Sequence, residues 1–359
     1  MNRELAKHLA SQPEVEVTIL LPNYTEEEKQ EADESNVRLA TPQAMPGIDP
    51  IMRLCFPSEE LDIDVVIGHG NKLGVPAHAI AKQRKCRRVH IVHTASEELS
   101  MFKKSENAIA EGEEKHRIEI DLCKEADIVA AIGPKVTDAI SPCLGPYDKH
   151  VMDITPGIFR EFSELKQSIG ERTKFCILVF GRGDSEDFEL KGYDIAAKAV
   201  AGLKDKSYKL IFVGAPKGKE EEIKDKLLKC GISPSQLIVR GFIKNRDSLG
   251  RLFCEADLAI MPSRTEGFGL TALEALSAGL PILVGDNSGF GQALQTLKST
   301  FVVDSDDPDD WREAIECVRG KPRKTRQEQA RCLLKSYDKK YQWAKQCEML
   351  VQNLREIRK

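Results

Sequence analysis

The chain has 359 residues, more than the roughly 250–300 that one hydrophobic core usually supports, so two domains are expected. Hydrophobic residues make up 41% of it and charged residues 31%, a composition that excludes the fibrous and disordered classes. The net charge of −4 gives no basic surface for a polyanion, so nucleic acid is not expected as a partner.

Ten cysteines are scattered along the chain without a C-x-x-C pair. This usage is typical of reduced, buried thiols and not of a disulfide framework or a zinc site. We therefore expect no metal. The glycine-rich runs 181–183 and 214–219 fit neither a dinucleotide-binding fingerprint nor a P-loop, so no cofactor is expected either. No stretch approaches the roughly 20 apolar residues of a membrane span, so the expected location is the cytoplasm or the cytoplasmic face of a membrane.

Short β-branched segments alternate with amphipathic helical segments, which predicts an α/β fold with parallel sheets covered by helices on both faces. The strands predicted in the first half are 15–21, 36–40, 64–67, 88–93, 127–132 and 151–154. Those predicted in the second half are 175–180, 209–213, 237–239, 257–261, 281–284 and 301–303. Helical spacing of apolar residues predicts a closing helix or helix pair over 325–359.

A turn at Pro156-Gly157 and the charged residues after it predict a linker near 158–173. Two similar runs, Cys123–Ala130 and Cys254–Ile260, each end a helix and enter a strand, which indicates two similar, doubly wound, Rossmann-like domains. Such sheets bind ligands at the carboxyl ends of their strands, so we expect the site in a cleft between the domains. The expected parts are an N-terminal domain (1–158), a C-terminal domain (159–340) and a C-terminal helix (341–359) that packs back on the N-terminal domain.

The segment from Pro262 to Pro281 is the most informative, and it predicts a strand end, a glycine-rich turn, a helix and a second strand. The glycines place the helix start near Leu270, where amide N–H groups without a helical partner form a site suited to a phosphate. Glu266 on the turn and Glu274 inside the helix can both face this site. On glycine spacing alone, an ordinary strand–helix connection with Glu274 on a solvated face is an equal alternative.

The full run Pro-Ser-x-x-Glu-Gly-Phe-Gly-Leu, then Leu-Glu-Ala and Ala-Gly-x-Pro, resembles the E-x7-E signature of retaining glycosyltransferases of family 4 (GT4). The resemblance covers about 151–294 and implies the GT-B fold, in which two Rossmann-like domains face each other across a cleft. It also implies that a sugar moves from a nucleotide-diphosphate sugar, the expected partner, to an unknown acceptor with retention of anomeric configuration and without a metal.

The resemblance also assigns the donor-binding residues. Arg182 and Lys191 would hold the donor diphosphate together with the amides of Leu270 and Thr271, while Glu274 would bind the ribose hydroxyls. For the two basic residues, the alternative is pairing with acidic residues of their own loop.

On the donor sugar, the resemblance places a catalytic residue, Glu266, and the backbone of Gly267, Phe268 and Gly269. His93, which ends a strand in the first half, is the second catalytic candidate. The alternative for His93 is a purely structural role.

Two features depart from the family pattern. Members open with a strand and a glycine-rich loop before a helix that resembles residues 3–9, whereas this chain begins inside that helix, and Gln292 stands where a carboxylate is usual. We therefore expect an amino-terminally truncated member with impaired activity, either part of a larger multidomain chain or a degenerate member of the family. The alternatives are a non-catalytic nucleotide-sugar-binding module of a larger protein and an enzyme that epimerises a sugar nucleotide.

Overall fold

The computed structural model describes residues 1–103, 106–183 and 186–357. Within this part, the ends of the twelve strands differ from the sequence prediction by two residues at most. The chain divides into two compact units. Unit 1 comprises Met1–Glu97, Glu111–Pro156 and Tyr341–Lys359, and unit 2 comprises Glu98–Ala110 and Gly157–Lys340.

Unit 1 contains two parallel sheets, one of β1-β2 and one of β3-β4-β5-β6. Its strands are β1 (Val17–Leu20), β2 (Val37–Ala40), β3 (Val65–His69), β4 (Arg87–Val92), β5 (Ile128–Ala131) and β6 (Val151–Asp153). Its helical elements are α1 (Asn2–Ala10), α2 (Glu26–Asp33), α3 (Pro50–Arg53), α4 (Gly70–Arg84), α7 (Pro134–Leu144), the 3₁₀ turn η1 (Gly145–Tyr147) and α16 (Trp343–Glu356). Two further helices, α5 (Ser96–Ser100) and α6 (Ala108–Lys124), cross the boundaries between the units. The sequence predicts one sheet in unit 1. Among the strands that the structure describes, β1 pairs only with β2 and β3 pairs only with β4, so two sheets form.

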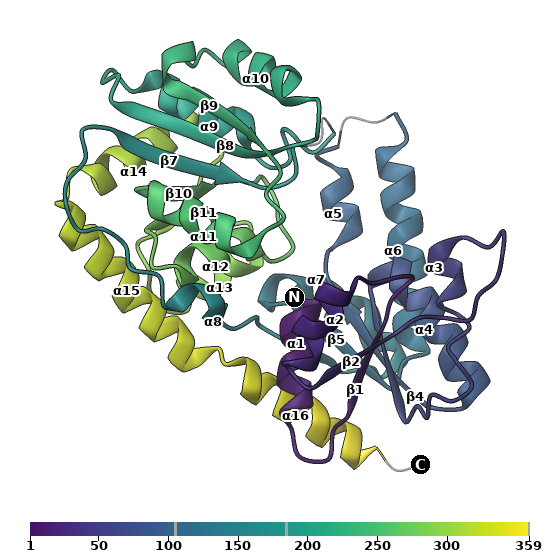
Figure 1. Cartoon of the computed structure of the whole chain (residues 1–359). Coiled ribbons are helices and arrows are strands. Elements are labelled where there is room, and N and C mark those ends of the chain that lie inside the picture. The colour runs from purple at the N-terminus through teal and green to yellow at the C-terminus, as the bar shows by residue number, and fades with distance from the viewer. Residues whose placement is uncertain (104–105, 184–185, 358–359) are drawn as a thin grey trace. The chain divides into compact units, whose positions relative to one another are not determined.

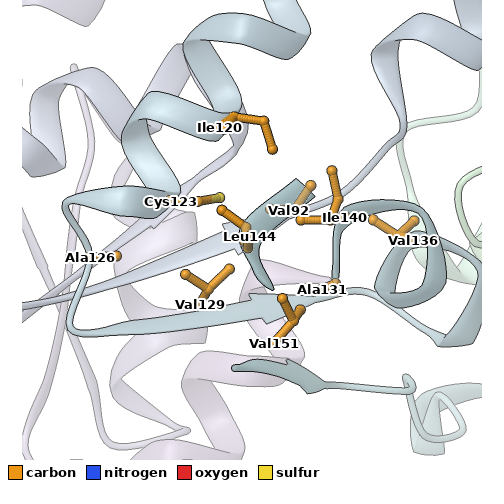
Figure 2. Packing of buried hydrophobic residues seen from close by; sticks show 10 residues of the cluster. All are labelled: Val92, Ile120, Cys123, Ala126, Val129, Ala131, Val136, Ile140, Leu144 and Val151. Atoms are coloured by element: carbon orange, nitrogen blue, oxygen red, sulfur yellow. The ribbon is translucent and has the colours of Figure 1, made fainter. Parts of the chain in front are cut away.

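A core of unit 1 lies between the four-stranded sheet and helices α6 and α7 (Figure 2). Helix α7 presents Val136, Ile140 and Leu144, four residues apart, so these side chains form one apolar stripe toward the strands. The other buried members of the cluster are Val92, Ile120, Cys123, Ala126, Val129, Ala131 and Val151.

Helix α16 completes unit 1 by packing on α1. The Cys347 thiol lies 3.8 Å from the carbonyl oxygen of Leu5, and the ring of Trp343 stacks on His8 with 6.2 Å between centroids. Arg87 on β4 donates a hydrogen bond to the carbonyl of Leu354. The last turns of the chain are therefore joined to the first helix and to the four-stranded sheet.

Unit 2 holds one six-stranded parallel sheet in the order β12-β11-β10-β7-β8-β9, drawn in teal and green in Figure 1. Its strands are β7 (Phe175–Phe180), β8 (Tyr208–Ala215), β9 (Leu237–Gly241), β10 (Leu258–Met261), β11 (Ile282–Gly285) and β12 (Val302–Val303). Its helical elements are α8 (Arg160–Ser163), α9 (Tyr193–Gly202), α10 (Glu220–Lys229), η2 (Pro234–Gln236), α11 (Arg246–Glu255), α12 (Leu270–Ser277), α13 (Gly289–Gln295), α14 (Pro308–Arg319) and α15 (Arg323–Lys340). The strand order reverses between β7 and β10, which is where doubly wound sheets bind ligands.

Two segments pack on unit 2 although the sequence suggests otherwise. The charged residues expected to form a linker include the buried Phe162, and buried Gln167 donates to the carbonyls of Phe253 (3.2 Å) and Ala278 (3.1 Å). The segment Glu98–Ala110, expected in the first domain, belongs to unit 2, and its first residue, Glu98, accepts a 2.7 Å hydrogen bond from the hydroxyl of Thr265. Among the residues that the structure describes, no helix combines the length and apolar character needed to cross a membrane.

Candidate functional site

Two loops meet at the carboxyl ends of the neighbouring strands β7 and β10. The amide of Arg264 donates to the carbonyl of Leu190 at 2.9 Å, which joins the loop after β10 to the loop after β7. Gly192 has φ of 63°, and a Cβ there would lie 1.7 Å from the carbonyl oxygen of Pro262. Only glycine therefore allows this approach of the two backbones.

The junction brings two predicted site residues together. The Lys191 ammonium lies 2.5 Å from a carboxylate oxygen of Glu266, and the two side chains are 21% and 19% exposed. A second pair holds the same loops: Arg264 donates to both carboxylate oxygens of Asp194 at 2.8 and 3.0 Å. Burial alone would raise the pKa of Asp194, but the Arg264 hydrogen bonds outweigh it and hold this pKa below its usual value. The sequence analysis missed the Arg264–Asp194 pair.

The start of α12 is open for an anion. Gly269 is its N-cap with φ of 103° and no side-chain cap, and among the described residues nothing accepts a hydrogen bond from the amides of Leu270 and Thr271. Hydrogen bonds from the amides of Gly289 (3.1 Å) and Phe290 (2.7 Å) to the carbonyls of residues 267 and 268 fix the preceding turn. The first amides of α12 can therefore bind a phosphate.

The aromatic residue of that turn does not present its side chain to a ligand. Phe268 is buried and packs against Phe290 with 5.8 Å between ring centroids. Like Gly267 and Gly269, it can offer a bound sugar only its backbone, as the resemblance implies.

Glu274 lies on the second turn of α12 and is bound to a residue that the sequence analysis did not single out. Nη1 of Arg246 donates to its Oε1 at 2.7 Å, and the same guanidinium contacts Glu161 on α8. Burial raises the pKa of Glu274, and the hydrogen bond and charge of Arg246 oppose that rise. The solvated-face alternative for Glu274 is wrong, since its side chain is 16% exposed and ion-paired.

The Arg182 side chain contacts an acidic residue of its own loop. Its side chain is 73% exposed, and its guanidinium is 3.7 Å from Asp187 of the same loop, a contact of the kind that the alternative reading expected. The hydroxyl of Tyr193 donates to the Arg182 carbonyl at 2.9 Å and fixes the backbone while the side chain extends into solvent. The neighbouring positions 184 and 185 lie outside the described residues.

In unit 1, His93 is paired with a second histidine. Its Nε2 lies 3.0 Å from Nδ1 of His69, and these residues lie at the carboxyl ends of the neighbouring strands β4 and β3. Burial lowers the pKa of His69 to about 3 and that of His93 to about 4, and nearby positive charge adds to both shifts. Both rings are therefore neutral at pH 7 and share one hydrogen bond. The catalytic role of His93 stays a prediction.

One group of described residues combines metal-ligating side chains: His90 on β4 with Glu119 and Cys123 on α6, whose ligand atoms lie within 4.8 Å of one another. Nε2 of His90 and Oε1 of Glu119 are 2.5 Å apart, closer than the roughly 3.3 Å that separates two ligands at tetrahedral zinc bond lengths. Burial raises the pKa of the Cys123 thiol, which disfavours the thiolate that binds metal. The arrangement fits a buried hydrogen-bonded pair better than a metal centre.

Comparisons with known proteins give a consistent result. The family described as "Family 4 Glycosyltransferase in conflict systems" matches residues 1–350. A D-inositol 3-phosphate glycosyltransferase from Acidothermus cellulolyticus is 28% identical over 251 residues, 63% of this chain and 53% of that protein. A mannosylfructose-phosphate synthase from Agrobacterium fabrum is 24% identical over 276 residues, 70% of this chain and 60% of that protein. The chain thus spans little more than half the length of these relatives.

Solved structures show the same fold. Sucrose-phosphate synthase from Thermosynechococcus elongatus superposes with a TM-score of 0.77 at 16% identity, over 99% of this chain and 92% of that one. Anabaena HepE, solved with UDP and glucose, superposes with a TM-score of 0.72 at 15% identity, over 99% and 96% of the two chains. The α/β fold of GT-B type, with two Rossmann-like domains, is confirmed.

Proposed function

The chain belongs to the family 4 glycosyltransferases of conflict systems, and we propose that it transfers a sugar from a nucleotide-diphosphate sugar to an acceptor with retention of anomeric configuration. The observation that carries the proposal is the juxtaposition, at the point where the strand order of unit 2 reverses, of Lys191, Glu266 and the open start of α12.

The donor diphosphate would bind at the amides of Leu270 and Thr271. Lys191 pairs with Glu266, so a diphosphate would compete with a carboxylate for its ammonium group. The Arg182 side chain is exposed and its contact with Asp187 is long, at 3.7 Å, so it would turn toward the same phosphates. Ribose hydroxyls would donate to Glu274, and Glu266 with the backbone of residues 267–269 would face the sugar.

The chemistry needs charge neutralisation more than a protein nucleophile. The bond between the sugar C1 and the diphosphate oxygen breaks while C1 bonds to the acceptor oxygen on the same face, and the acceptor proton passes to the departing diphosphate. Lys191, Arg182 and the helix amides would stabilise that leaving group, and such preorganised donors act most strongly where charge develops. Glu266 would orient the sugar, and His93 stays the second candidate for a catalytic role.

The test begins with calorimetric titration of UDP, GDP and ADP, followed by nucleotide release from the matching nucleotide sugars. Lys191→Ala should weaken the preferred nucleoside diphosphate much more than its nucleoside, because only the former presents the charge. It should also reduce turnover by roughly 10²–10³, the usual loss of one preorganised donor. Lys224→Ala, which removes an exposed α10 lysine paired with Glu221, is the matched control and should leave both unchanged.

Two results would count against the proposal. Absence of binding to all three diphosphates would remove the nucleotide site itself. Tight binding without nucleotide release, with or without candidate acceptors, would leave a binding module and would remove the transferase activity.

A further inference from the structure

Arg246 is placed against the usual preference of its helix. It is the first residue of α11, the end at which the helix dipole is positive and a cation is disfavoured. The helix start is already capped, since the Asn245 side chain accepts a 2.9 Å hydrogen bond from the Ser248 amide. The arginine is therefore not needed to begin α11, and its role must come from its contacts.

Those contacts join three helices of unit 2. Nη1 of Arg246 donates to Oε1 of Glu274 on α12 at 2.7 Å, and Nε donates to Oε1 of Glu161 on α8 at 2.8 Å. The guanidinium carbon lies 4.4 Å from the centre of the Phe162 ring, so an aromatic face also supports it. Two carboxylates and one ring thus fix its plane and direction.

The arrangement matters for Glu274 because that side chain is largely buried. Burial favours the neutral acid and raises the pKa of Glu274, whereas the hydrogen bond and charge of Arg246 oppose that rise. Within unit 2, the other charged group that acts on it is Glu161, whose negative charge favours the acid form. Arg246 occupies Oε1 only; among the described residues, nothing donates a hydrogen bond to Oε2, which can still accept one.

We propose that Arg246 is a positioning residue for nucleotide binding: it holds Glu274 as an oriented carboxylate whose free oxygen accepts hydrogen bonds from the ribose, with Glu161 as its own second counter-ion. The ribose as ligand of Glu274 rests on the proposed function. The coupling between Arg246 and Glu274 needs no nucleotide and can be measured without one.

The ligand-free measurement follows the Glu274 carboxyl carbon by NMR in protein labelled with ¹³C at the glutamate side-chain carboxyl, with Glu274→Gln to assign the signal. In Arg246→Gln the titration midpoint of Glu274 should move to higher pH, because burial is then unopposed. In Glu161→Gln the midpoint should not rise, because that variant removes only the second carboxylate. An unchanged midpoint in Arg246→Gln would overturn the proposal.

The binding measurement titrates UDP, GDP and ADP between pH 5 and 9 and expresses each affinity relative to the unmodified protein at the same pH. At the acidic end of this range Arg246→Gln should bind roughly ten-fold more weakly, as expected when a charged hydrogen-bond partner is lost, and its relative affinity should recover as the pH rises. Arg246→Lys should lose less affinity, because lysine keeps the positive charge although it lacks the two-pronged guanidinium group. The affinity of Glu161→Gln should stay within about two-fold of that of the unmodified protein.

The double variant Arg246→Gln/Glu274→Gln separates positioning from general damage. It should show no recovery with pH, because residue 274 no longer carries a carboxyl group that can ionise. A loss that is equal at every pH in Arg246→Gln would indicate a packing effect and overturn the proposal. If no diphosphate binds the unmodified protein while the NMR midpoint still moves, the proposed function fails and the Arg246–Glu274 coupling stands.

Discussion

The two units use the same alternation of strands and helices with different results. In unit 2 the first strand, β7, lies in the middle of the sheet and pairs with β8 on one side and β10 on the other. In unit 1 no described strand has that place, so β1 and β3 each pair on one side only. The strands β8 and β10 are almost wholly buried, whereas β1 and β3 are mostly half-exposed.

This difference shows what a central strand contributes to a doubly wound sheet. It satisfies the backbone groups of both neighbours, and it brings the loops after two adjacent strands into contact, as at Lys191 and Glu266. Unit 1 builds its polar group at the ends of β3 and β4 instead, where His69 and His93 meet. We therefore expect unit 2 to be the more stable unit.

Each unit carries its own fluorescent reporter, which makes the comparison measurable. The chain has two tryptophans, Trp311 on α14 of unit 2 and Trp343 on α16 of unit 1. Trp311→Phe leaves a reporter of unit 1, and Trp343→Phe leaves a reporter of unit 2. Urea unfolding of both single-tryptophan proteins then gives a separate transition for each unit.

The largest expected effect breaks the loop junction of unit 2. Gly192→Ala combines a left-handed backbone with a Cβ only 1.7 Å from the Pro262 carbonyl oxygen, so unit 2 should lose more than about 3 kcal/mol of unfolding free energy. Gly218→Ala, with φ of 79° and nothing within 4 Å of the added carbon, should lose only about 1–2 kcal/mol. Equal losses would show that the close approach is unimportant. The Trp343 transition should not move in either variant.

Acid should weaken unit 1 selectively. All seven histidines lie at or before residue 150 and none lies in unit 2. Because the folded pKa values of His69 and His93, about 3 and about 4, lie below the ordinary 6.5, the unfolded chain binds protons first as the pH falls. Stability present above pH 6.5 should be lost on acidification, by up to about 1.4 kcal/mol per pH unit for each histidine.

The measurement follows Trp343 fluorescence in urea between pH 6.5 and 5, with Trp311 as the internal control. His69→Gln/His93→Gln should reduce the slope of stability against pH for unit 1 and leave that of unit 2 unchanged. A slope that survives this double substitution would assign the acid sensitivity to other groups.

The smallest expected effect is local and concerns the strand edges of unit 1. Amide hydrogens in peptides that cover β1 and β3 should exchange at least roughly ten-fold faster than those that cover β8 and β10, because strands paired on one side open more readily. Hydrogen exchange followed by mass spectrometry at pH 7 gives both pairs in one experiment. Equal protection would mean that the single-sided pairing has no energetic consequence.

Much of this architecture is readable in the sequence because it depends on local patterns. All twelve strands follow from β-branched runs, and the start of α12 at Leu270 follows from Gly269. The repeated helix-to-strand run also has a physical basis: Asp127 accepts from the Arg88 amide at 2.7 Å, and Asp257 accepts from the Cys176 amide at 2.8 Å. Each aspartate joins the start of its strand to the neighbouring strand.

The parts that sequence reasoning missed depend on contacts between distant residues. Arg246 lies 28 residues from Glu274 and 85 from Glu161, and no periodicity links such positions. The hydrogen bond from Thr265 to Glu98 spans 167 residues, so the membership of 98–110 in unit 2 was equally out of reach. The one feature of the sequence that points to Arg246 is its place at the start of a helix, where the helix dipole disfavours a positive charge.

The position of α16 has a consequence for synthesis on the ribosome. Unit 2 is complete once Lys340 has emerged, but unit 1 still lacks Tyr341–Lys359, and with them the contacts of Cys347 with Leu5 and of Leu354 with Arg87. The unit that is translated first should therefore be the last to reach its final form, with the face of α1 that later receives α16 exposed in the meantime. Nascent chains from which Lys340 has emerged while α16 is still inside the ribosome should recruit chaperones through unit 1, and emergence of α16 should end that association.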